Sequence, residues 1–100
     1  MATTIGVARL GLYLEGTFSL KDKRQTVRSI TQQVRNRFNV GIAETADLDD
    51  ARVATLVIVC VSNSAPHAQE MLQTVIGFVE RKVELGVVEE IETELIPYGD

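Results

Sequence analysis

The sequence predicts an α+β fold with four strands and two helices in the order β-α-β-β-α-β. Three observations lead to this prediction. Apolar and polar residues alternate in one stretch near each end of the chain, which is the period of a strand. A β-branched apolar run lies in the middle of the chain. The segments on either side of that run carry apolar residues at helical spacing.

The first strand is predicted from Ile5 to Glu15, with Gly16 allowing the turn that follows it. Side chains alternate between the two faces of a strand. One face therefore carries Ala8, Leu10, Leu12 and Leu14, and the other carries Val7, Arg9, Gly11 and Tyr13. The first set is typical of a buried face.

The first helix is predicted to begin after Ser19, a residue type that caps helix N-termini. Apolar residues then recur on one side of the helix at Leu20, Val27, Ile30, Val34 and Phe38. Asn39 follows the last basic turn and can close the helix in the left-handed conformation. A short strand is expected from Val40 to Thr45, and residues 46–52 are expected to form a solvated loop.

The third strand is predicted from Val53 to Ser62, the most apolar segment of the chain. Ser64 is the expected N-cap of the second helix, since Pro66 fits only the first turn of a helix. Gly86 ends that region, and a strand from Val87 to Ile96 follows, with Pro97 stopping it. The buried side of the second helix is predicted to hold Ala68, Leu72, Val75 and Val79, flanked by Met71 and Phe78.

With right-handed crossovers, this order gives a four-stranded antiparallel sheet with two helices on one face, the ferredoxin-like sandwich. The first and third strands are central in such a sheet and are also the most apolar here. The acidic fourth strand suits an edge protected by charge. The 100 residues are expected to form a single ferredoxin-like domain, residues 1–100.

Composition favours a globular cytoplasmic protein. The chain is 45% hydrophobic and 24% charged. The longest apolar run, Leu56–Val61, is far shorter than the roughly 20 residues that cross a bilayer. The N-terminus carries no signal-peptide pattern. The one cysteine, Cys60, lies in the β-branched run and is expected to be a buried hydrophobe.

Positive charge is concentrated in the predicted first helix. Between Thr17 and Val40 there are six basic residues and one acidic residue, a net charge of +5, whereas the whole chain carries −4. At 100° per residue, four basic residues fall within a sector of about 60° beside the apolar face. This basic stripe consists of Lys21, Arg24, Arg28 and Arg35, and Lys23 and Arg37 lie toward the other edge.

Three of these cations, Lys21, Lys23 and Arg24, stand in the first turns, where the helix dipole disfavours positive charge. An anionic ligand would offset that cost, and the free N–H groups of a helix N-terminus also favour phosphate. The competing interpretation is a solvated helix whose bases pair with the protein's own acids. Both interpretations remain open from the sequence.

Several short segments of the chain resemble the bacterial YlxP-like domains of unknown function. These segments are Ser19–Arg24, Arg35–Val40, Ala43–Glu44 and Val61–Asn63. The resemblance extends over nearly the whole chain. It implies a small cytoplasmic ferredoxin-like domain with no established activity, often encoded beside genes of translation initiation and ribosome assembly. The commoner residue at the position of Asp22 is Glu, a conservative departure.

No pattern in the sequence demands enzymatic chemistry, so the protein is expected not to be an enzyme and to need no cofactor. A metal site is not expected, because His67 has no second His or Cys at ligand spacing. The segment from Asp47 to Asp50 lacks the glycine and glutamate of a calcium loop. The spacing of Gly6, Gly11 and Gly16 matches no nucleotide-binding motif. No membrane partner is expected.

Two functional hypotheses follow. The first is a binder of RNA or of a ribosomal surface that contacts phosphates through Lys21, Lys23, Arg24, Arg28, Arg35 and Arg37. The second is a protein-protein interaction or structural module that self-associates, as a homodimer, through the sheet face that the helices leave open. The interface residues expected for the second hypothesis are Val7, Tyr13, Val57, Val59 and Val61.

Overall fold

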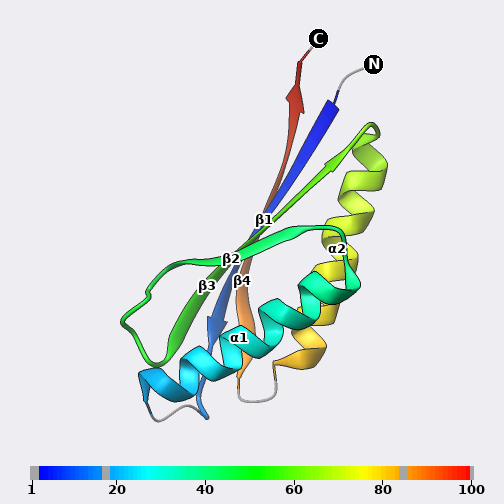
Figure 1. The fold of residues 1–100 in the computed structure, drawn as a ribbon. Helices are drawn as coiled ribbons and strands as arrows, with labels where there is room; N and C mark the ends of the chain where they lie inside the picture. The colour runs from blue at the N-terminus through cyan, green and yellow to red at the C-terminus, as the bar shows by residue number, and fades with distance from the viewer. Residues whose placement is uncertain (1–2, 17–18, 84–85, 100) are drawn as a thin grey trace.

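The computed structural model describes residues 3–16, 19–83 and 86–99. The elements are β1 (Thr3–Tyr13), α1 (Leu20–Arg37), β2 (Gly41–Ala46), β3 (Val53–Ser62), α2 (Ala65–Lys82) and β4 (Val87–Tyr98). They occur in the predicted β-α-β-β-α-β order (Figure 1). None of the helices in the described ranges is long and apolar enough to span a membrane.

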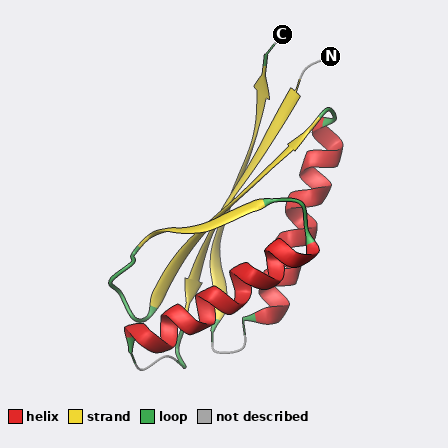
Figure 2. Cartoon of the chain, viewed as in Figure 1, coloured by secondary structure: helices red, strands yellow, loops and turns green. Residues whose placement is uncertain are grey.

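The strands form one antiparallel sheet in the order β2-β3-β1-β4. As predicted, β1 and β3 are central and the acidic β4 is an edge strand. Both helices lie on one face of the sheet (Figure 2). The start of β1 lies beside the end of β4, where Thr3 pairs with Tyr98. This arrangement is the ferredoxin-like fold.

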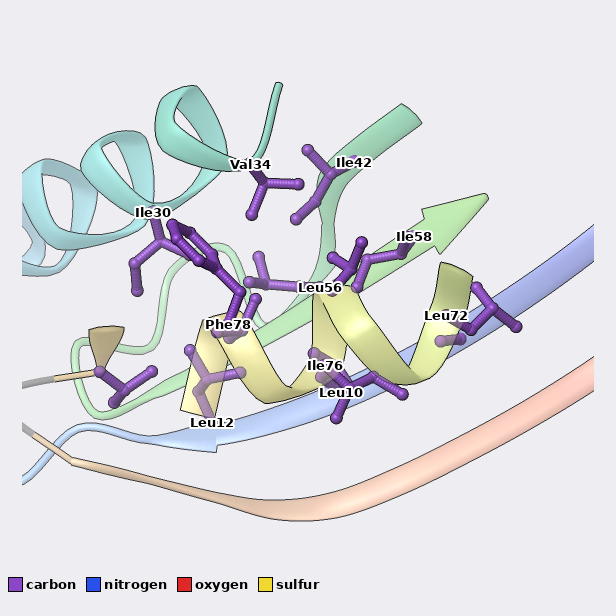
Figure 3. Packing of buried hydrophobic residues seen from close by; sticks show 14 of the residues in the cluster. Leu10, Leu12, Ile30, Val34, Ile42, Leu56, Ile58, Leu72, Ile76 and Phe78 are labelled. Atoms are coloured by element: carbon purple, nitrogen blue, oxygen red, sulfur yellow. The ribbon is translucent and has the colours of Figure 1, made fainter. Parts of the chain in front are cut away.

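The core lies between the sheet and the two helices. The predicted inner face of β1 is confirmed, because Ala8, Leu10, Leu12 and Leu14 are all buried. Side chains from α1, α2, β2 and β3 meet this face, among them Val34, Leu72 and Ile58 (Figure 3). Cys60 belongs to the same cluster, as expected, and its burial raises the pKa of its thiol, against a smaller opposing effect of a backbone hydrogen bond with Gly6.

Both predicted helix starts are confirmed. Ser19 Oγ accepts a hydrogen bond from the backbone N–H of Asp22 at 3.1 Å, and Ser64 Oγ accepts one from that of His67 at 3.3 Å. Each hydroxyl satisfies an N–H group that has no partner within its own helix.

Several predicted element ends are wrong. β1 spans Thr3–Tyr13 and not Ile5–Glu15, and β2 spans Gly41–Ala46 and not Val40–Thr45. Phe38, not Asn39, caps α1, in an extended conformation with its N–H donated to the Val34 carbonyl oxygen at 2.9 Å. Among the described non-glycine residues, only Asp47 has a positive φ, of 61°. At the other end of the chain, β4 continues through Pro97 to Tyr98. An edge strand tolerates proline because one side of its backbone has no strand to pair with.

Candidate nucleic-acid interface

The four residues of the basic stripe are exposed on α1. This helix lies beside β2 (Figure 1). The position of the stripe is fixed by Arg35, whose Nη2 donates a hydrogen bond to the carbonyl oxygen of Ile42 in β2 at 2.7 Å. At 1.5 Å per residue, the stripe extends about 21 Å from Lys21 to Arg35. It therefore forms a line of cations along the β2 edge of the molecule.

No residue of the stripe is in an ion pair with a carboxylate of the residues that the structure describes. Within the described ranges, the ion pairs join Arg9 to Glu92 and Lys23 to Glu44, and neither involves a residue of the stripe. Most of the acidic residues lie elsewhere, with Glu89, Glu90, Glu92 and Glu94 in β4 at the opposite edge of the sheet. The acidic row of β4 therefore lies at the edge opposite the stripe, while the 47–52 loop beside the start of α1 also carries Asp47, Asp49 and Asp50.

The prediction that Lys23 is available to an anionic partner is wrong. Its side chain is fully buried, and its Nζ lies 2.9 Å from Glu44 Oε2. The same ammonium donates hydrogen bonds to the backbone carbonyl oxygens of Asp47 and, at 2.7 Å, of Asp50. The Lys23 ammonium thus makes one ion pair and two hydrogen bonds within the protein. Glu44 Oε2 is buried and accepts no hydrogen bond from the described residues, so the charge of Lys23 neutralises it through the ion pair alone.

The burial of Lys23 has a signal in the sequence that the stripe prediction did not use. Lys23 lies three residues after Leu20 and four before Val27, so it occupies a position on the apolar line of α1. A lysine at such a position needs a buried acidic or carbonyl partner. Its partners come from β2 and from the 47–52 loop, which the prediction described only as solvated.

Arg37 lies on the flank of α1 that faces α2, away from the stripe. Its guanidinium carbon is 5.0 Å from the centre of the Phe78 ring, and Lys82 Nζ is 5.6 Å from the same centre. Phe38 meets Phe78 edge to face at 5.4 Å. Arg37 and Lys82 therefore cover a buried aromatic ring by cation–π contacts and keep their charges exposed.

The open face of the sheet carries the residues predicted as an interface. Val7, Tyr13 and Val57 are half-buried there, whereas Val59 and Val61 are 40% and 65% exposed. Arg9 pairs with Glu92 on the same face, and that carboxylate raises the pKa of the guanidinium. Glu90 and Glu94 are also exposed there, opposite Gly11 and Val7 in the β1–β4 register. This face is apolar toward one end and acidic along β4.

The described residues include no group of three or more His, Cys, Asp or Glu side chains that could hold a metal ion.

The sequence matches one family model over residues 5–91, that of a protein of unknown function, DUF503. The chain belongs to the DUF503 family. It is 33% identical over 76 residues to the uncharacterized protein YlxP of Bacillus subtilis (strain 168), a match that covers 76% of this chain and 83% of YlxP. The resemblance to YlxP-like domains is therefore confirmed, and neither match describes an activity.

Two solved structures share the fold. The de novo designed protein Foldit4 is 12% identical with a TM-score of 0.54, and the match covers 94% of this chain and 96% of that protein. The C-terminal domain LarC2, from a cyclometallase involved in synthesis of the NPN cofactor of lactate racemase, is 11% identical with a TM-score of 0.51. That match covers 99% of this chain and 58% of the LarC2 chain. At these identities the likeness shows the fold alone.

Proposed function

We propose that this protein is a small, non-enzymatic, cytoplasmic binding protein that docks on structured RNA through the basic stripe of α1. One observation carries the proposal: four exposed cations form a line on one flank of α1. None of them is in an ion pair with a carboxylate of the residues that the structure describes. Lysine and arginine side chains arranged in this way bind phosphate groups.

The shape of the β2 edge suits the backbone of an RNA duplex. A line of about 21 Å along α1 is long enough to contact several phosphates, and duplex RNA is recognised mostly through its backbone and its wide minor groove. The acidic β4 edge repels RNA, so it restricts binding to one side of the molecule. Ribosomal RNA is the target class that the resemblance to YlxP-like domains implies.

The open sheet face is a poorer RNA surface. Sheet-type RNA recognition stacks bases on aromatic residues of the central strands, and β3 has none while β1 offers Tyr13. The neighbouring carboxylates of Glu90, Glu92 and Glu94 add repulsion.

The experiment that tests the proposal is a titration of a fluorescent RNA hairpin with the protein at several salt concentrations. If four phosphates are contacted, the logarithm of the affinity is expected to fall against the logarithm of the salt concentration with a slope of roughly −3 to −4. Absence of saturable binding at low salt would remove the proposal.

A second candidate function is self-association through the open sheet face. The observation that favours it is the exposure of Val59, Val61 and Tyr98, which is 40%, 65% and 66%. Strand dimensions give the whole face an area of about 600–700 Å², so its apolar end alone would bury less than the roughly 800 Å² that each partner buries in a stable complex. A twofold pairing of the apolar ends would keep the two acidic β4 rows apart.

Light scattering at high micromolar concentration tests this candidate. The wild-type protein is expected to be a dimer, and Val61→Lys is expected to make it monomeric by placing a charge in the interface. Leu48→Lys is the matched control, because Leu48 is 53% exposed and lies in the 47–52 loop, outside the sheet. A wild-type monomer would exclude self-association.

A further inference from the structure

A groove lies between the C-terminal end of α1 and the first half of α2. Its volume is about 270 Å³. The floor is apolar and is formed by Phe38, Val40, Met71 and Val75. The exposed rim is formed by Arg37, Asn39, His67, Glu70 and Thr74. We refer to these nine residues as the helix-end groove.

The rim has hydrogen-bonding capacity that the fold does not use. In the part of the chain that the structure describes, the side chains of Asn39, His67 and Glu70 make no hydrogen bond, whereas Thr74 Oγ1 donates to the Glu70 carbonyl oxygen at 2.8 Å. An apolar floor with a few convergent polar groups is the usual composition of a small-ligand site.

Positive charge lies at one end of the groove. Arg37 belongs to the rim, and Lys82 shares the Phe78 ring with it. Neither cation is in an ion pair with a described carboxylate. Arg37 therefore offers the groove a positive charge that no described carboxylate neutralises, while Lys82 lies outside the groove, beside the Phe78 ring.

The size and the charge together favour a nucleotide over an apolar peptide side chain. Small-molecule sites begin at roughly 300 Å³, so the groove suits one flat ring and not a larger ligand. The thioether of Met71 makes favourable contacts with the edges of aromatic rings. An apolar side chain would use the floor but would leave the charge of Arg37 and the polar rim without partners.

The groove also continues the basic stripe around the end of α1. Arg35 and Arg37 are two residues apart, which places their side chains about 200° apart around the helix. Arg35 reaches the β2 side and Arg37 the α2 side, as their contacts show. An RNA strand that runs along the stripe and leaves it at Arg35 would therefore reach the groove after it passes Asn39.

From these features we infer that the helix-end groove receives one unpaired base of the bound RNA, with the phosphate of that nucleotide held by Arg37. The inference rests on the proposed RNA binding and adds to it a preference for RNA with unpaired nucleotides. Glu70 only accepts hydrogen bonds, so it favours a base whose edge donates, and guanine offers N–H and NH₂ donors. Uracil offers one N–H donor.

The test compares a hairpin RNA that has an unpaired guanine-rich loop with a blunt duplex of the same stem. The wild-type protein is expected to bind the looped RNA roughly tenfold or more tightly, the effect of stacking one base. Thr74→Tyr fills the groove from an exposed position, and it is expected to abolish this preference and leave the affinity for the duplex unchanged. Gln73→Tyr, on the exposed part of the same helix outside the groove, is the control and keeps the preference.

A preference for the looped RNA that survives Thr74→Tyr would overturn the inference and leave the proposed function standing. If neither RNA binds, the proposed function fails. NMR titrations with GMP, UMP and inorganic phosphate then test separately whether the groove binds a nucleotide. In that case the groove is a nucleotide site independent of RNA if GMP shifts the amide resonances of Asn39 and Glu70 more strongly than phosphate or UMP does. Equal shifts from phosphate and GMP would show that the base is not recognised and would overturn the inference.

Discussion

Lys23→Met is expected to lower the free energy of unfolding by about 3–5 kcal/mol, the cost of breaking a buried ion pair by removing one partner. The methionine fills a similar volume but leaves Glu44 without its counter-charge, since the Glu44 side chain is 14% exposed. The substitution also removes the two hydrogen bonds from Lys23 Nζ to the carbonyl oxygens of Asp47 and Asp50. These bonds hold the 47–52 loop against α1. Chemical denaturation followed by circular dichroism measures the loss.

Lys21→Met is the control for this prediction, because Lys21 is an exposed lysine in the same helical turn. Its expected effect is within about 0.5 kcal/mol. The double variant Lys23→Met/Glu44→Leu removes both charges and is expected to lose less stability than Lys23→Met alone. Equal stabilities for Lys23→Met and Lys21→Met would show that Lys23 has no structural role.

Arg24→Glu/Arg28→Glu is expected to abolish detectable RNA binding. The stripe has four basic residues, so reversing two of them changes its charge from +4 to zero. Both side chains are exposed and outside the described ion pairs, so the thermal unfolding temperature is expected to change little. Fluorescence anisotropy with the RNA hairpin measures the affinity.

Two single variants with the same change in net charge test whether the position of the charge matters for RNA binding. Arg28→Glu and Arg52→Glu each change the net charge by two units, but Arg52 is an exposed residue of the 47–52 loop, outside the stripe. Arg28→Glu is expected to weaken binding and to make the salt slope shallower by about 1, as the loss of one phosphate contact requires. Equal weakening by the two variants would show that net charge, and not the stripe, governs the affinity.

The fold followed from local patterns because those patterns agree with the tertiary structure. Alternation along β1 places Leu10 and Leu12 in the core, and the hydroxyls of Ser19 and Ser64 begin the helices where the sequence predicts. Failures occurred where a distant element decides the outcome. Pro97 remains in a strand because β1 pairs with it, and nothing in its neighbours indicates that pairing.

The part of the candidate site that depends only on spacing within α1 could be predicted from the sequence. Helical spacing alone places Arg24, Arg28 and Arg35 on one flank, so the stripe could be predicted without knowledge of the sheet. Spacing within α1 indicates that Lys23 is buried, but it does not identify the partner, Glu44, which β2 brings beside the first turns of α1. The position of Arg37 depends on Phe78, a residue of the other helix. Contacts between elements far apart in the sequence cannot be assigned from spacing within one helix.

The most direct test of the central claim is an NMR titration of the wild-type protein with the RNA hairpin, in which the perturbed residues are mapped on the structure. The perturbations are expected to cluster on residues 21–35 of α1 and on the adjacent β2 edge, with β4 unaffected. Perturbations concentrated on the open sheet face around Val59 and Glu92, with α1 unchanged, would contradict binding through the basic stripe.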